Sequence, residues 1–216
     1  MSNVGICTVP TPVYSSEEGL EFIAFPQTRF VCEGGDERWI HVKTNEYPTE
    51  TSLFVAKPLI TLSKKHVEER KRELPSPERI LTFMQSIVGT RYLWGGNWAQ
   101  GIPELLQFFP HLTTDDELYR GVDCSGLLFQ ASDGCTPRNT QELFHYGKEI
   151  PFETKRVQPL DMLVWPGHVL FILNEHQTIE SRSGKGVVIS SLDERVAELQ
   201  KMKQLFSFRR WHPDLT

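Results

Sequence analysis

The four residues Asp123-Cys124-Ser125-Gly126 combine types that could do nucleophilic chemistry. Asp123 is a good helix-capping residue, so Cys124 would be the first residue of the helix that follows. Free backbone N–H groups and the positive end of the helix dipole favour a thiolate at that position. On this stretch alone a buried, inert cysteine remains the better interpretation, because free cysteine is usually core filler.

The composition of the chain limits the alternatives. It has 216 residues, 39% hydrophobic and 24% charged, with a net charge of −5, which is typical of a soluble globular protein. No basic stripe is present, so neither nucleic acid nor an anionic membrane surface is expected as a partner. The N-terminus lacks a signal-peptide pattern, and we expect a cytoplasmic protein with reduced thiols. No CxxC pair or histidine cluster has metal-ligand spacing, which argues against a zinc site involving Cys7, Cys32, Cys124 or Cys135.

The elements that must position the cysteine divide the chain in three. Residues 1–62 read as short strands broken by turn residues, which predicts a small all-β barrel. Residues 63–77 are rich in charge and are predicted to form a linker helix. Residues 78–216 begin with an amphipathic helix, continue with the helix after Asp123, and end in strand-like runs typical of an antiparallel meander. The predicted fold class is therefore α+β, preceded by an all-β module.

Five motifs, in this order, resemble the NlpC/P60 family of papain-like cysteine peptidases, which act on bacterial cell-wall peptides. The resemblance covers roughly residues 78–211 and implies helices packed on an antiparallel sheet. The N-terminal module resembles a bacterial SH3 domain through Trp39-Ile-His-Val. The five motifs are Tyr92-Leu-Trp94-Gly95-Gly96, Asp123-Cys124-Ser125-Gly126, Pro137-Arg138-Asn139-Thr140 with Gly147 after it, Leu160-Asp161-Met162-Leu163, and His168-Val169.

The resemblance implies a catalytic role for each of several residues. Cys124 would be the nucleophile, and His168 the general base and acid. The third family position, about a dozen residues after the histidine and usually histidine, is Glu180 here. A hairpin that turns near residues 174–175 would bring Glu180 or Ser181 opposite His168, with a register uncertain by a residue or two. Without the other motifs, His168 would be interpreted as a core histidine and Glu180 as an outward strand residue.

Further positions are implied to bind substrate. Tyr92 matches the family tyrosine near the thiolate and, with the backbone N–H of Cys124, would hold the oxyanion. The remaining candidates are Ser125, Arg138, Asn139 and Thr140. Family members that bind a free L-alanine amino group carry aspartate where this chain has the neutral Asn139, so a requirement for that amine is in question.

The predicted function is hydrolysis of peptidoglycan stem peptides at the γ-D-glutamyl–meso-diaminopimelate bond, on muropeptide substrates, by a monomer without metal or organic cofactor. Other acyl chemistry on the same scaffold stays open, namely a muramoyl-alanine amidase, an acyltransferase or a lipid-acting thiol hydrolase. An inactive muropeptide-binding protein also stays open. Residues 97–122 are longer than the usual link between these motifs, and we hypothesise that they form a lid or a specificity wall over the cleft. Trp94 is predicted to be a core aromatic.

Overall fold

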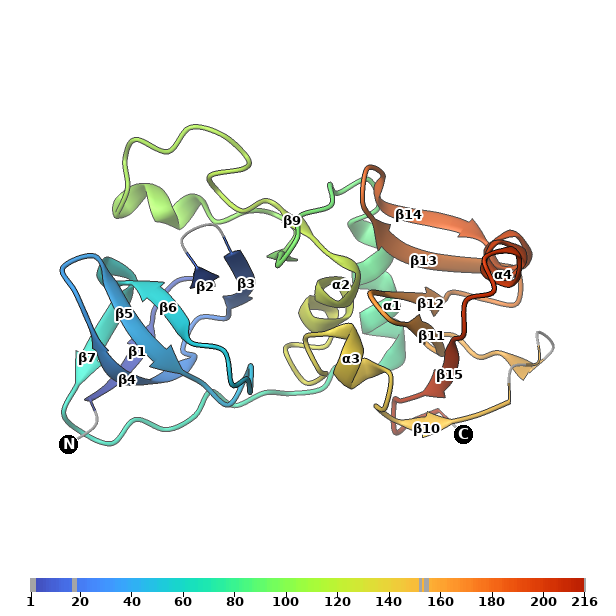
Figure 1. The fold of residues 1–216 in the computed structure, drawn as a ribbon, viewed down its shortest axis with the longest axis horizontal. Helices are drawn as coiled ribbons and strands as arrows, with labels where there is room; N and C mark the ends of the chain where they lie inside the picture. The colour runs from blue at the N-terminus through green and yellow to red at the C-terminus, as the bar shows by residue number, and fades with distance from the viewer. Residues whose placement is uncertain (1–2, 17–18, 152, 154–155, 216) are drawn as a thin grey trace. The chain divides into compact units, whose positions relative to one another are not determined.

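The computed structural model describes residues 3–16, 19–151, 153 and 156–215 (Figure 1). The chain folds into two compact units, which are described separately. The first comprises Met1–Arg72 and Leu93–Gly121, and the second comprises Glu73–Tyr92 and Val122–Thr216. Residues 93–121 thus belong with the N-terminal unit and not, as expected from their place in the chain, with the C-terminal one.

The first unit is built on one antiparallel sheet with the strand order β3-β2-β6-β5-β4-β1-β7. The predicted all-β module is therefore present. Among the described residues no pairing joins β3 to β7, so the closed barrel expected from the sequence is not observed. The elements are β1 (Asn3–Cys7), β2 (Thr11–Ser16), β3 (Gly19–Ala24), β4 (Arg29–Gly35), β5 (Trp39–Lys43), β6 (Leu53–Ala56), a 3-10 turn η1 (Lys57–Leu59) and β7 (Ile60–Ser63).

Residues 93–121 pack on this sheet. They contain β8 (Asn97–Trp98) and the 3-10 helix η2 (Pro103–Gln107), and Ile102 and Leu105 are buried in the same core as the strands. The Asn97 side chain accepts from the Ile23 backbone N–H and donates to its carbonyl, both at 2.8 Å. The segment is therefore a structural part of the first unit.

The linker helix predicted over residues 63–77 does not form, and residues 64–76 contain no helix. The stretch has too few apolar residues to give a helix a face to bury. Instead, the Arg70 guanidinium pairs with the buried Glu46 at 3.2 Å and lies 4.6 Å over the Phe25 ring. Charged side chains such as Arg70 thus attach this segment to the first unit although the segment forms no helix.

The second unit is α+β, as predicted. Its antiparallel sheet has the order β10-β15-β11-β12-β13-β14, and α2 packs on β12, β13 and the helix α1 (Figure 1). None of the helices in the described ranges is long and apolar enough to span a membrane. The elements are α1 (Pro77–Ser86), α2 (Cys124–Ala131), α3 (Thr140–Leu143), β10 (Lys148–Glu149), β11 (Met162–Trp165), β12 (His168–Ile172), β13 (Gln177–Arg182), β14 (Gly186–Ser191), α4 (Leu192–Lys201) and β15 (Ser207–Arg210). The short strand β9 (Gly121–Val122) spans the boundary between the two units.

Helix α4 is the element that the strand pattern does not predict. Ser191 caps it by accepting a hydrogen bond from the backbone N–H of Glu194 at 3.3 Å. Leu192, Val196 and Leu199 are buried and share a core with the apolar side chains of β11 and β12. The C-terminal part is therefore a meander interrupted by a helix that covers the sheet.

Candidate active site

Cys124 is the first residue of α2, as predicted. The Oδ1 atom of Asp123 accepts a hydrogen bond from the backbone N–H of Gly126 at 2.7 Å and so caps the helix. Only 5% of the Cys124 surface is exposed. The local sequence therefore fixes the position of the thiol through the backbone of the first helical turn.

A buried ion pair lies beneath this turn. The Arg138 guanidinium donates to both carboxylate oxygens of Asp123, at 2.9 and 2.7 Å, and to the Ser125 hydroxyl at 2.9 Å. The Ser125 hydroxyl also donates to Asp123 Oδ1 at 3.2 Å. The structure thus places Ser125 and Arg138, both predicted to bind substrate, in a network that holds the helix cap.

The sulfur of Cys124 lies against the backbone on both sides of His168. Sγ is 4.0 Å from the carbonyl oxygen of Gly167, and the Val169 backbone N–H donates toward it. Within the described part of the chain, Sγ makes no hydrogen bond to the His168 ring. The thiol is therefore next to the start of β12 but is not already paired with the imidazole.

The protonation state of this thiol differs from the prediction. Burial, and then the negative charge of Asp123, raise the pKa of Cys124 to about 12, although Arg138 and backbone N–H groups act in the opposite direction. These raising effects exceed the pull of the helix dipole, which is what favoured a thiolate in the sequence. The free chain therefore holds a neutral thiol at pH 7.

The imidazole of His168 is held by Glu180. Its Nε2 atom lies 2.7 Å from Oε2 of Glu180, which is completely buried on β13. Ser181, the other sequence candidate, instead donates to the carbonyl oxygen of Val122 at 2.7 Å. The predicted contact between Glu180 and His168 is thus observed, and it leaves the Nδ1 atom of His168 for another partner.

Glu180 has a second partner, Arg195 on α4, which is not among the predicted site residues. Arg195 Nε forms an ion pair with Oε1 at 2.6 Å, and Nη2 donates to Oε2 at 3.0 Å. Burial raises the pKa of Glu180, but the hydrogen bond with His168 and the charge of Arg195 outweigh it, so the pKa is lowered overall. The sequence signal that could have found Arg195 is the Ser191-to-Glu194 spacing of a capping box before an apolar helical stripe.

Tyr92 pairs with Val122 through an isolated parallel bridge at the entry to α2. Burial, followed by the negative charges of Asp123 and Cys124, raises the pKa of Tyr92 to about 12. The phenol therefore stays protonated and is able to donate a hydrogen bond near the sulfur. The nearby Trp94 is 72% exposed and is not the core aromatic expected from the sequence.

Asn139 caps the short helix α3. Its Oδ1 accepts from the backbone N–H of Glu142 at 2.9 Å, and its Nδ2 donates to Glu142 Oε2 at 3.1 Å. Thr140 is the first residue of that helix, and both residues are half-buried. The side chain of Asn139 is thus already engaged within its own turn.

Comparison with known proteins identifies the family of the chain. The sequence profile of the NlpC/P60 family matches residues 89–205. The chain belongs to the NlpC/P60 family. It is 29% identical over 130 residues to a protein of Haemophilus influenzae named "Probable endopeptidase NlpC homolog", covering 58% of this chain and 60% of that relative.

Solved structures of NlpC/P60 proteins are also similar to the chain. One from Bacillus cereus is 18% identical, with a TM-score of 0.47, and covers 98% of this chain and 64% of its own. RipD from Mycobacterium tuberculosis, described as a non-catalytic NlpC/p60 domain protein adapted to peptidoglycan binding, is 18% identical with a TM-score of 0.45. That match covers 62% of this chain and 95% of RipD.

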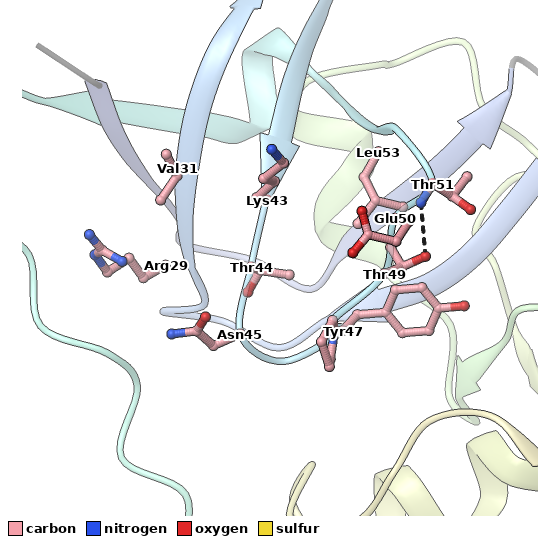
Figure 2. Close-up of a pocket in the computed structure, with 11 residues that line it drawn as sticks. Arg29, Val31, Lys43, Thr44, Asn45, Tyr47, Thr49, Glu50, Thr51 and Leu53 are labelled. Atoms are coloured by element: carbon pink, nitrogen blue, oxygen red, sulfur yellow. Dashed lines mark hydrogen bonds between the residues drawn. The ribbon is translucent and has the colours of Figure 1, made fainter. Parts of the chain in front are cut away.

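The first unit of this NlpC/P60 protein has a hollow of its own on the β4–β5 side of the sheet (Figure 2). Its lining contains neither cysteine nor histidine. The two cations of the lining are already paired, Arg29 with Glu69 at 3.0 Å and Lys43 with Glu33 at 2.7 Å. Nucleophilic chemistry is therefore assigned to the second unit and not to this hollow.

Proposed function

We propose that the chain is a cysteine peptidase that hydrolyses peptidoglycan stem peptides between γ-D-glutamate and meso-diaminopimelate. The observation that carries the proposal is the position of the Cys124 sulfur against the backbone that flanks His168, whose ring is held by Glu180. Family membership supports the substrate class, since NlpC/P60 proteins are typically peptidoglycan endopeptidases. The name of the Haemophilus relative supports peptide hydrolysis.

The first half of the proposed reaction forms a thioester. Because the thiol is neutral, His168 acts as a general base through its free Nδ1 atom and takes the proton as Sγ of Cys124 attacks the peptide carbonyl. The Cys124 backbone N–H and the Tyr92 hydroxyl donate to the oxyanion. The C–N bond then breaks, and protonated His168 gives its proton to the leaving amine of the diamino acid.

The second half restores the enzyme. A water molecule loses a proton to His168 and adds to the thioester carbonyl, and the C–S bond breaks to release the γ-carboxyl product. The thiolate of Cys124 recovers its proton from His168. In both halves Glu180 stabilises the imidazolium and fixes the ring, which is the role of the third member of a catalytic triad.

The test is incubation of the purified chain with L-Ala-γ-D-Glu-meso-diaminopimelate, with products identified by mass spectrometry. We expect L-Ala-D-Glu and free diaminopimelate, and none from a Cys124→Ala variant. A muramyl-linked tripeptide provides the second arm, because Asn139 has no charge to bind a free amine and both substrates should be cleaved. No release from either substrate would exclude the proposed peptidase, and cleavage at the muramoyl–alanine bond would indicate an amidase instead.

A second candidate is an inactive muropeptide-binding protein. The observation that favours it is the raised pKa of Cys124, since a permanently neutral thiol is a poor nucleophile. Calorimetry with the same tripeptide distinguishes the two. Binding without release of diaminopimelate over hours would support the binding protein.

A further inference from the structure

Arg195 is a buried arginine of helix α4 whose guanidinium reaches into the proposed catalytic group. Only 4% of its surface is exposed. It contacts both carboxylate oxygens of Glu180, at 2.6 and 3.0 Å, and shares Oε2 with the Nε2 atom of His168 at 2.7 Å. The Nη2–Oε2 contact is a hydrogen bond, whereas Nε meets Oε1 as an ion pair without hydrogen-bond geometry. Together the two contacts restrict the carboxylate and so the direction in which Oε2 meets the ring.

The guanidinium is itself held from other directions. Its carbon lies 5.9 Å from the centre of the Trp165 ring, and that ring lies 5.0 Å from the His168 ring. Its Nη1 atom pairs with Glu198 on the same helix, and Glu198 also pairs with Arg182 of β13 at 3.3 Å. A chain of alternating charges thus runs from the imidazole to the partly exposed surface of α4.

We propose that Arg195 is a positioning residue for the reaction, which holds the Glu180 carboxylate in the orientation and charge state that keep the His168 ring ready for proton transfer. The inference rests on the proposed function, because it requires His168 to be the base. The proposal adds Arg195 as a fourth residue to the Cys124–His168–Glu180 group. Arg195 belongs to helix α4, which lies outside the motifs predicted from the sequence. The arginine acts only through Glu180 and has no contact with substrate in this scheme.

The charges around Glu180 give the expected pH dependence. His168 faces it from β12 and Arg195 faces it from α4, while Glu198 and Arg182 balance each other further out. Without the guanidinium, the carboxylate keeps its full burial but loses a cation, so the Glu180–His168 pair takes up a proton at higher pH. As the pH is lowered, the activity of a variant without the guanidinium should therefore begin to fall at a higher pH than the activity of the wild type.

The experiment compares the wild type with Arg195→Met, Arg195→Lys and Glu198→Gln in tripeptide hydrolysis from pH 5 to 9. We expect Arg195→Met to lower kcat by about 10- to 100-fold. This is less than the roughly 10⁴-fold loss of kcat that follows when the carboxylate of a catalytic triad is itself replaced. Its acid limb should move up by about one pH unit or more. KM should stay within about threefold, because uniform substrate binding is not affected.

The controls separate positioning from support of the fold. Arg195→Lys keeps the charge but loses the two-pronged contact, so the acid limb should return toward that of the wild type while kcat recovers only in part. Glu198→Gln removes a carboxylate that contacts Arg195 only at Nη1, so its effect on both quantities should be clearly smaller than that of Arg195→Met. Circular dichroism identifies variants that do not fold, and if Arg195→Met fails, Arg195→Lys carries the comparison.

A readout without substrate separates a failure of this inference from a failure of the proposed function. The His168 ring signals, assigned by their loss in His168→Gln, are followed by NMR during a pH titration. We expect the midpoint to move to higher pH in Arg195→Met and to stay near the wild-type value in Glu198→Gln. A folded Arg195 variant with unchanged kcat, pH profile and ring titration would overturn the inference. A wild type that cleaves nothing, together with a shifted ring titration in Arg195→Met, would count against the peptidase alone.

Discussion

Two buried arginine–carboxylate pairs in the second unit support the two reactive side chains in different ways. Asp123 and Arg138 lie beneath Cys124, and the contact between Asp123 and α2 is a hydrogen bond from a backbone N–H. Glu180 and Arg195 lie behind His168, and the contact is with the imidazole itself. The first pair therefore acts on the fold around the nucleophile, and the second acts on a group that changes charge.

The difference shows that two similar buried ion pairs can have opposite effects on the charged form of the side chain that each one supports. The charge of Asp123 raises the pKa of Cys124, so the carboxylate that positions the nucleophile also opposes its ionisation. The charge of Glu180 would stabilise the imidazolium that forms when His168 takes the thiol proton. In this arrangement the Cys124 thiol is neutral and the His168 ring is held in place by Glu180. The arrangement therefore favours proton transfer from thiol to imidazole during the proposed attack over a preformed thiolate–imidazolium pair.

The largest expected effect comes from neutralising the second pair. Glu180→Gln should lower kcat for the tripeptide by about 10³- to 10⁴-fold, because the imidazolium loses its stabilising charge and the ring its orientation. Steady-state hydrolysis at pH 7 measures this, with Glu175→Gln, at an exposed carboxylate of the same unit, as the control. A loss smaller than tenfold would mean that Glu180 does not act on the chemistry.

Removing the cation of the first pair should affect stability. Arg138→Met leaves the Asp123 carboxylate buried without its partner and should lower the free energy of unfolding by about 3–5 kcal/mol. Urea denaturation followed by circular dichroism measures this change. The control is Arg156→Met, whose exposed pair with Glu153 is worth only about 0–1 kcal/mol. Equal stability of the two variants would contradict a supporting role for Arg138.

Tyr92 lies beside the first pair but should affect catalysis alone. Because its raised pKa keeps the hydroxyl protonated, it can donate to an oxyanion at all pH values up to about 11. Tyr92→Phe should lower kcat by about 10²- to 10³-fold with little change in the unfolding midpoint. An unchanged kcat would remove Tyr92 from the oxyanion site.

The smallest effect concerns the reactivity of the thiol in the free protein. With a pKa near 12, Cys124 should react slowly with iodoacetamide at pH 7, and its rate should still be rising at pH 9. Asp123→Asn removes a negative charge and should increase the rate at pH 8.5 by about tenfold, because the thiolate becomes easier to form. A rate that is already constant from pH 6 to 8 would indicate a preformed thiolate–imidazolium pair.

The sequence was sufficient to predict the part of the site that local rules govern. Asp123 caps α2 because its side chain and the first turn are adjacent in the chain. Glu180 was predicted from the family resemblance, and the short hairpin between β12 and β13 left the choice between Glu180 and Ser181 open. Arg195 was missed because its role depends on how α4 covers the sheet. Burial, which depends on the whole unit, raises the pKa of Cys124 and so opposes the thiolate that the helix start favours.

The same division holds for the larger elements. Most strands of the two sheets follow from alternating side chains and turn residues and were predicted as strand-like runs, whereas β7 and β10 were not predicted. The helix expected over residues 63–77 did not form, since charge alone gives a helix no face to bury. The place of residues 93–121 on the first sheet could not be predicted either, because it depends on contacts such as Asn97 with Ile23 that are 74 positions apart.

The central claim is that Cys124 forms a thioester with the γ-carboxyl group of the substrate. Wild type is mixed with excess L-Ala-γ-D-Glu-meso-diaminopimelate, quenched in acid within one turnover, and analysed by intact and peptide mass spectrometry. We expect an L-Ala-D-Glu acyl adduct on the peptide that contains Cys124, which is absent from Cys124→Ala. Release of diaminopimelate by the Cys124→Ala variant, or an adduct on another residue, would contradict the account.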